Sequence, residues 1–232
     1  MKGSTKIYLF AFLFLIFNRL SAQIRYQQFT LGGGAGAATA YAGADLPKTN
    51  AAFYVSACYY PTTFFNVGLE GQSGTLSGVS TPQSIDLKSF NNNFKSIVLD
   101  ANLYLGAFFG AQQNGFLNFI KNFYGGVGYG VMINNVDNAN LGELKITDHI
   151  NNTLSIIQFN SGYEFNILKN RFDEPLLKAD LSARFYYVTG KGIDGYYDTY
   201  SKTHSYYTYF AVGLKYTFIT GSSYGRGYKK YD

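Results

Sequence analysis

The sequence predicts an all-β fold, an eight-stranded antiparallel transmembrane up-and-down β-barrel. Three observations support this prediction. Apolar side chains alternate with polar or small ones over segments of about ten to fourteen residues, which is the periodicity of strands. Aromatic residues make up 19% of the 232 residues and charged residues only 14%, with 26 glycines, a mixture unusual for a soluble helical protein. Beyond the N-terminus no apolar run is long enough for a spanning helix, so a membrane-embedded chain must span with strands.

The first 22 residues are typical of a signal peptide. Lys2 and Lys6 precede an apolar run over residues 7–17, and the small residues Ser21 and Ala22 suit cleavage before Gln23. The run is shorter than the roughly 20 residues of a spanning helix. We therefore expect export, then a leader segment at 23–29, the barrel at 30–219 and a flexible tail at 220–232.

The alternating segments predict the strands in chain order. We expect eight strands within residues 30–42, 51–60, 64–76, 96–105, 123–133, 152–165, 176–189 and 205–219. In the clearest segment one face holds Leu177, Ala179, Leu181, Ala183, Phe185 and Tyr187, and the other holds Lys178, Asp180, Ser182, Arg184 and Tyr186. An even strand number suits a single-chain bacterial barrel.

The connections differ in length in the way that such barrels require. With both chain ends in the periplasm, the polar stretches 43–50, 77–92, 137–151 and 190–203 face outward, while 60–63 and 169–175 form short periplasmic turns. The connection 108–122 is long and apolar for a periplasmic turn. We expect it to form a short interfacial helix.

Aromatic residues lie near the expected strand ends, where membrane girdles are found. They are Tyr59, Phe65, Phe123, Phe165, Tyr187 and Phe218. The alternative is a soluble barrel like that of lipocalins, with an apolar interior and a charged exterior. The apolar face of these strands carries almost no ionisable residue, which favours the membrane barrel.

The other strand face carries ionisable residues that would point into the lumen. They are Glu70, Asp100, Glu164, Lys178, Asp180, Arg184 and Lys215. Four acids and three bases can neutralise one another, so we interpret them as a structural network, with a proton or ion path as the alternative. Eight strands leave room only for side chains, so a diffusion pore is not expected.

Charge and residue counts argue against several classes of function. Without the signal-peptide residues Lys2, Lys6 and Arg19, 16 basic residues stand against 14 acidic ones, a formal charge near +2, so no nucleic-acid partner is expected. The single cysteine, Cys58, forms no intramolecular disulfide and is interpreted as a strand filler. The glycines at 32–36 lack a following Lys-Ser/Thr pair, so no cofactor is expected.

A lipid A-modifying enzyme would need a histidine, a serine and an acid together at the outer rim. The candidates are His204, Ser205, Asp194 and Asp198. Adjacent strand residues point to opposite faces, so His204 and Ser205 would not share a proton. The other histidine, His149, is too distant in sequence to suggest a metal pair. We assign no catalytic and no metal residue.

Residues 30–219 resemble the small outer-membrane β-barrel proteins of the OmpA/OmpX-like superfamily, in particular the "porin family" chains of Bacteroidetes. The Ser21-Ala22-Gln23 junction is similar to those of that phylum. The resemblance implies the fold and an outer-membrane location. The chain departs from the family in one respect, because Phe218 is followed by residues 219–232 instead of ending the chain.

The first functional hypothesis is a non-enzymatic outer-membrane barrel with a side-chain-filled lumen, acting in envelope integrity, adhesion or partner binding through its extracellular loops. The alternatives are a lipid-modifying outer-membrane enzyme and an accessory barrel of a secretion or conjugation apparatus. The expected partners are outer-membrane lipid or lipopolysaccharide and an envelope protein.

Overall fold

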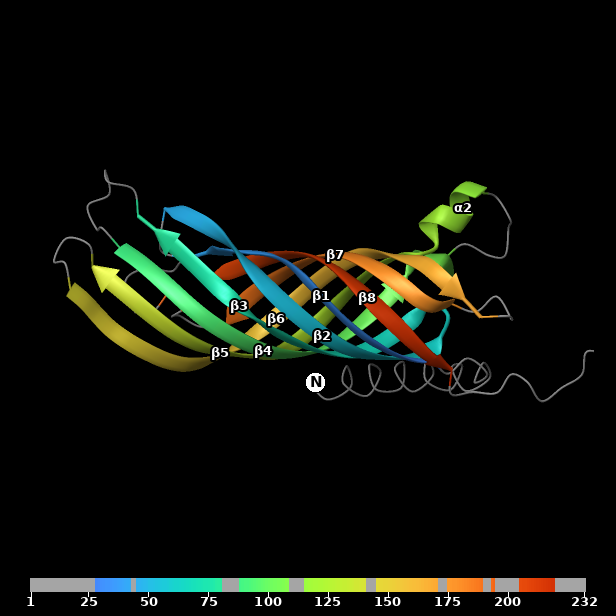
Figure 1. Cartoon of the computed structure of the whole chain (residues 1–232), viewed down its shortest axis with the longest axis horizontal. Coiled ribbons are helices and arrows are strands. Elements are labelled where there is room, and N and C mark those ends of the chain that lie inside the picture. The colour runs from blue at the N-terminus through green and yellow to red at the C-terminus, as the bar shows by residue number, and fades with distance from the viewer. Residues whose placement is uncertain are drawn as a thin grey trace, which may run out of the picture.

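The structure is a computed structural model that describes residues 28–42, 45–80, 88–108, 115–140, 145–170, 175–189, 193–194 and 205–219. Its strands are β1 (Gln28–Tyr41), β2 (Leu46–Thr62), β3 (Phe65–Val79), β4 (Lys88–Tyr104), β5 (Phe123–Asn140), β6 (Lys145–Lys169), β7 (Pro175–Thr189) and β8 (Tyr206–Ile219). Each strand pairs with the next, and β8 pairs with β1 to close the barrel (Figure 1). The expected eight-stranded antiparallel up-and-down barrel is confirmed.

The predicted signal peptide, most of the 23–29 segment and the predicted tail lie outside the described residues, and these assignments stay predictions. We call the end of the barrel that joins β3 to β4 and β5 to β6 the loop end. The opposite end, which carries a short helix, is the helix end (Figure 1).

Several strands extend further toward the loop end than the sequence predicted. The stretches 46–50, 77–79, 88–92, 137–140 and 145–151, expected as loops, belong to β2 through β6. The backbone ladder continues there although outward positions such as Asn91 and Asp137 are no longer apolar. Side chains also bridge neighbouring strands, with Thr75 Oγ1 donating to Asn93 Oδ1 at 3.1 Å and Asn134 Nδ2 to Asn152 Oδ1 at 2.8 Å. Polar cross-strand pairs of this kind stabilise a sheet without apolar burial.

The connection between β4 and β5 contains η2 (Leu105–Ala107), a 3-10 turn, and α2 (Gly115–Ile120). A short helix was expected in this stretch and is present; its interfacial position stays a prediction. The ring of Phe119 packs on Phe123 and Tyr163, with centroids 5.7 and 5.0 Å apart, which ties α2 to the barrel wall. No helix of the described residues is long and apolar enough to cross a membrane.

Side chains alternate between the exterior and the interior of the barrel as predicted. On β4, Ile97 and Leu99 are about 60% exposed, whereas Asp100 between Leu99 and Ala101 is buried. Gly126 on β5 is one reason the interior packs closely: a Cβ there would collide with the Asn102 side chain and the Ala101 carbonyl oxygen. Because Gly126 has no side chain, Asn102 of β4 and Asn160 of β6 can both occupy the space on the inner side of β5.

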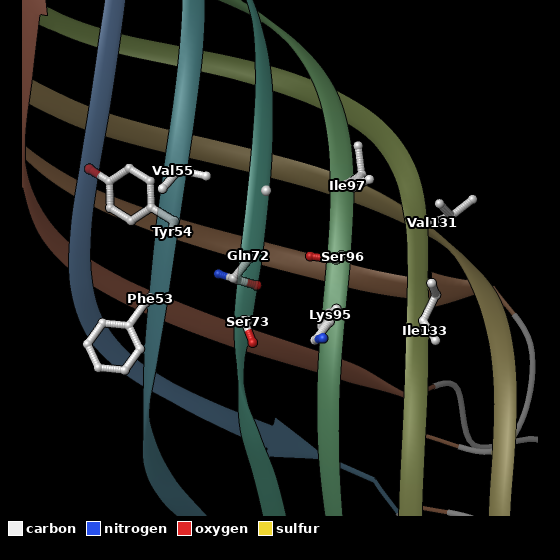
Figure 2. Close-up of a pocket in the computed structure, with 11 residues that line it drawn as sticks. Phe53, Tyr54, Val55, Gln72, Ser73, Lys95, Ser96, Ile97, Val131 and Ile133 are labelled. Carbon is white, nitrogen blue, oxygen red and sulfur yellow. The ribbon is translucent and has the colours of Figure 1, made fainter.

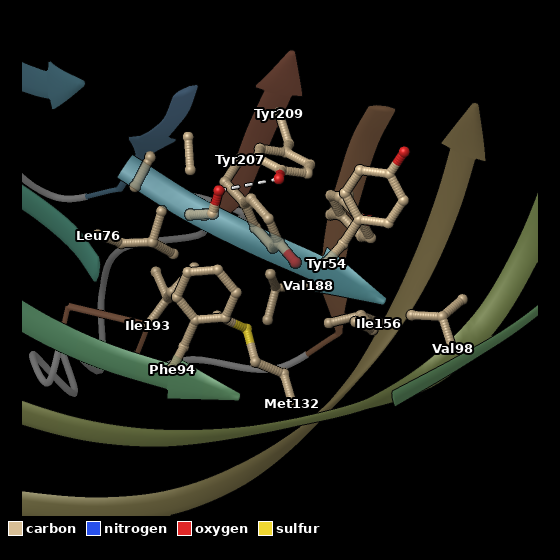
Figure 3. Close-up of a cluster of buried hydrophobic side chains, with 14 of the residues drawn as sticks. Tyr54, Leu76, Phe94, Val98, Met132, Ile156, Val188, Ile193, Tyr207 and Tyr209 are labelled. Atoms are coloured by element: carbon tan, nitrogen blue, oxygen red, sulfur yellow. Dashed lines mark hydrogen bonds between the residues drawn. The ribbon is translucent and has the colours of Figure 1, made fainter. Parts of the chain in front are cut away.

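The interior also contains an apolar part, in addition to the seven predicted ionisable residues. Toward the loop end it contains a cluster of buried apolar side chains that includes Phe94, Val98, Met132, Ile156 and Val188 (Figure 3). Apolar inward positions become more frequent toward the loop end of β4 to β7, with Asn92 and Asn134 buried among them. A two-residue period cannot reveal this change, because it separates the two faces of a strand without identifying which one is inside.

Candidate functional site

The ionisable side chains lie together in the barrel interior. All seven predicted residues are buried, and they come from five strands: Glu70 from β3, Asp100 from β4, Glu164 from β6, Lys178, Asp180 and Arg184 from β7, and Lys215 from β8. They occupy the part of the interior between the apolar cluster and the helix end. They are buried because each lies at a strand position whose side chain points into the barrel.

One group of charges centres on Glu164. Its Oε2 atom accepts from Lys178 Nζ at 2.9 Å, and its Oε1 atom accepts from Lys215 Nζ at 2.9 Å. Lys215 Nζ also lies 3.2 Å from Asp180 Oδ1. Two lysines and two carboxylates thus form a chain without excess charge. Buried ions require such pairing, because an isolated charge in the interior costs several kcal/mol.

A second pair joins β3 to β7 across the interior. Arg184 Nη2 lies 2.7 Å from Glu70 Oε2. The guanidinium stands over the ring of Tyr54, 4.3 Å from its centroid, and 5.4 Å from that of Tyr209. Arginine is suited to this position because its planar group can pair with a carboxylate and stack on aromatic rings at once.

Tyrosine hydroxyls complete the coordination of these carboxylates, a role that the sequence analysis did not assign. Tyr104 and Tyr60 donate to Glu164 Oε1 at 2.8 and 3.1 Å, and Tyr186 donates to Glu70 Oε1 at 3.0 Å. Tyr124 and Tyr54 donate to Asp180 at 2.8 and 3.2 Å. The available signal was their parity, which places all five on the charged face. Tyrosine fills space and supplies a donor at its tip.

Asp100 differs from the other acids, because no ion pair with it is recorded among the described residues. Its Oδ2 atom accepts weaker bonds from Asn102 Nδ2 at 3.3 Å and Asn160 Nδ2 at 3.4 Å. A cavity of about 10 Å³ separates it from Arg184 and Lys215. That volume is near the minimum for one water molecule, so the interior is filled by side chains at this level.

The arrangement supports packing, not chemistry. The carboxylates of Glu70, Glu164 and Asp180 are occupied by donors, and the cavity lined by Glu70 and Asp100 is too small for a substrate. Among the described residues no three His, Cys, Asp or Glu side chains are grouped so as to hold a metal ion. The structural role of the seven residues stays our proposal, tested below.

The residues of the alternative catalytic site are only partly described. Asp194 and Ser205 are both buried at the loop end. His204 and Asp198 lie outside the described residues, as does the side chain of His149. The structure therefore supplies no geometry for a proton transfer at this rim.

The barrel exterior divides into an apolar and a polar zone. On β5 the outward side chains from Phe123 to Ile133 are apolar or glycine, and those of Asn135 and Asp137 beyond them are polar and exposed. At about 3.3 Å per residue and a tilt near 40°, the apolar zone is about 25 Å tall, the height of the band on outer-membrane barrels. A closed barrel with this band is a protein of the bacterial outer membrane.

Comparisons with known proteins find likeness in fold only. No family model matches the chain, and no curated protein sequence matches it. Ail, the attachment invasion locus protein of Yersinia pestis, is similar with 11% identity and a TM-score of 0.48, over 83% of this chain and 99% of that one. The outer membrane protein OprG from Pseudomonas aeruginosa has 10% identity and a TM-score of 0.43, over 84% and 98% of the two chains. The outer membrane protease OmpT from Escherichia coli has 12% identity and a TM-score of 0.34, over 82% and 97%.

Proposed function

We propose that this chain is a non-enzymatic outer-membrane barrel that acts through its loop end, in envelope integrity, adhesion or binding of an envelope partner. The observation that carries the proposal is the filled interior. Charged side chains and tyrosines occupy the part toward the helix end, and apolar side chains occupy the part toward the loop end. A barrel packed in this way is an anchor, because solutes have no path through it.

Two described residues between β7 and β8, Ile193 and Asp194, are buried at the loop end of the interior. Ile193 is completely buried and belongs to the apolar cluster. Its carbonyl oxygen accepts a hydrogen bond from Asn92 Nδ2 at 2.9 Å, and the same amide donates to Asn134 Oδ1 at 2.9 Å. These contacts hold Ile193 inside the apolar cluster at the loop end, which supports an anchor over a channel.

The polar zone of the wall supplies the surface for the proposed role. β5 continues for seven residues beyond Ile133, to Asn140, which corresponds to about 18 Å along the barrel axis. Exposed residues on this zone include Asn91, Asn93 and Asp137. A hydrogen-bonded wall that projects from the membrane is a rigid support for loops, and loops on rigid supports carry recognition.

The resemblance to the "porin family" chains of Bacteroidetes is part of the proposal. It rests on the Ser21-Ala22-Gln23 junction and the strand pattern. An outer-membrane lipid and an envelope protein are the proposed partners.

The test combines conductance with binding. The barrel, refolded into planar bilayers, should show no discrete conductance steps; steps of porin size would refute the anchor. Cells that carry a variant with residues 81–87 and 141–144 each replaced by Asn-Gly should lose surface adhesion or co-purifying envelope proteins relative to wild type. The variant must keep its heat-dependent gel mobility, which shows that the barrel is folded. Full retention of both adhesion and co-purification would contradict the proposed role of the loop end.

The same cells decide between the competing functions. Lipid A mass spectra should be identical with and without the protein; a mass change that His204→Ala abolishes would establish the enzyme instead. Co-purification of secretion or conjugation components would identify an accessory barrel.

A further inference from the structure

We propose that a groove on the outside of the wall formed by β2 to β5 binds a phosphorylated glycolipid of the outer leaflet. The inference rests on the outer-membrane placement proposed above. The groove consists of an apolar part of about 400 Å³ and a polar part of about 520 Å³ nearer the loop end. The two parts share Phe53, Ser73, Lys95 and Ile133, so they form one continuous depression.

Two cross-strand rows build the groove. In one row Val55 pairs with Gly71, Gly71 with Ile97 and Ile97 with Val131. Figure 2 shows Val55 on one side of β3 and Ile97 and Val131 on the other. Gly71 has no side chain, so the floor of the groove is backbone and its walls are large apolar side chains. The opening faces the lipid, because these positions point out of the barrel.

The second row lies two residues along each strand nearer the loop end and contains Lys95, the only charged side chain that lines the groove among the described residues. Phe53 pairs with Ser73, Ser73 with Lys95 and Lys95 with Ile133. Lys95 is exposed and lines both parts of the groove. Figure 2 shows it on β4, between Ser73 and Ile133 of the neighbouring strands. Within the part of the chain that the structure describes, no carboxylate lines either part. The lining thus presents one positive charge at the border of an apolar surface.

The position of Lys95 fits a phosphate at the membrane surface. A lysine at the bilayer midplane of a barrel costs about 2–4 kcal/mol and close to nothing near the interface. The outward neighbour Ile97 toward the helix end is apolar, and Asn93 toward the loop end is polar. Lys95 therefore lies at the boundary between acyl chains and headgroups, where an ammonium meets the phosphates of a lipid.

The polar part of the groove favours a glycolipid over a phospholipid. It is lined by amide and hydroxyl side chains, among them Thr75, Asn93, Asn135 and Asn151. Such groups bind sugar hydroxyls, since they donate and accept at once. The occupant that satisfies the whole groove has acyl chains in the apolar part, a phosphate at Lys95 and sugar beside the asparagines. Both volumes lie within the range of small-molecule sites.

Two substitutions test the two parts separately. Lys95→Gln removes the charge and retains a polar side chain. Gly71→Leu fills the apolar floor, and its Cβ would meet only Val55 Cγ2, at 3.5 Å, so the wall tolerates it. The matched controls are Lys48→Gln, an exposed lysine on β2 that does not line the groove, and Gly125→Leu, an exposed glycine on β5 with its nearest neighbour, Asn160 O, at 3.8 Å.

The readout is native mass spectrometry of the full barrel in detergent, titrated with bisphosphorylated lipid A, its dephosphorylated form or phosphatidylglycerol. Wild type should bind bisphosphorylated lipid A best, and Lys95→Gln should weaken that binding at least about tenfold while leaving the dephosphorylated form unaffected. Gly71→Leu should weaken the binding of both forms of lipid A. The two control variants should leave the binding of both forms unchanged.

Equal binding by Lys95→Gln and Lys48→Gln would overturn the inference. Equal affinity of wild type for phosphatidylglycerol and lipid A would overturn the glycolipid as occupant. If the wild-type protein shows no heat-dependent gel mobility, or if it is recovered outside the outer membrane, the proposed function on which the inference rests is refuted instead.

Discussion

Replacing Arg184 with methionine tests whether the interior ion pairs hold the barrel together. The guanidinium lies 2.7 Å from Glu70, and both side chains are about 5% exposed or less. Methionine retains much of the length and apolar contact of arginine but removes its charge. The Glu70 carboxylate then stays buried with Tyr186 as its recorded donor, at 3.0 Å.

The expected loss in the free energy of unfolding follows from the unpaired charge of Glu70. Removing one partner of a buried pair typically costs 3–5 kcal/mol, and the contact of Arg184 with the Tyr54 ring contributes within this range. We expect Arg184→Met to lower the free energy of unfolding by about 4 kcal/mol. The double variant with Glu70→Gln leaves no unpaired charge at this pair, and the amide oxygen can still accept from Tyr186. It should therefore recover at least about 2 kcal/mol of that loss.

The assay is urea unfolding of the refolded barrel in lipid vesicles, followed by gel mobility because the chain has no tryptophan. Lys48→Met, on an exposed lysine, is the control and should change stability by less than about 0.5 kcal/mol. A cost below about 1 kcal/mol for Arg184→Met, or a double variant no more stable than the sum of its single variants, would refute the structural role of the network.

Three further predictions concern packing inside the barrel. Gly126→Ala should destabilise the barrel by about 1–3 kcal/mol because its Cβ collides with neighbouring atoms. Gly125→Ala, next to it on the opposite face, should be neutral in the same urea titration. Equal effects of the two substitutions would argue that Gly126 does not point inward. Cys58 is buried and free, so a maleimide should label it only after urea unfolding, and rapid labelling of the folded barrel would reveal an open interior. Phe94→Ala removes a ring packed 5.5 Å from that of Tyr207 and should cost about 3–5 kcal/mol; an unchanged midpoint would show that the apolar cluster contributes nothing.

Much of the fold could be predicted from local pattern alone. Alternation along 176–189 identified β7 and both of its faces, because side chains on a strand point to opposite sides whatever lies across from them. The strand number and the antiparallel order followed from the same reasoning, and the helical connection at α2 followed from the length and apolar character of 108–122. The ends of the strands toward the loop end could not be predicted, since the ladder continues through asparagine, serine and threonine pairs such as Asn134 and Asn152, which carry no apolar period.

The candidate site was predictable in its members but not in its contacts. The sequence by itself determined that Glu70 and Arg184 lie on the polar face of their strands, because parity is a local property of each strand; a membrane barrel then places that face inward. Only the tertiary structure decided that these two residues, 114 positions apart, form a pair, that Lys215 bridges two acids and that Asp100 faces amides. The groove of Gly71 and Lys95 depends in the same way on the register of β2 to β5. Which side chains meet across the barrel interior depends on the stagger of the strands at closure, and that stagger results from the pairing register of all eight strands together. The alternation along any one strand carries no information about this overall register.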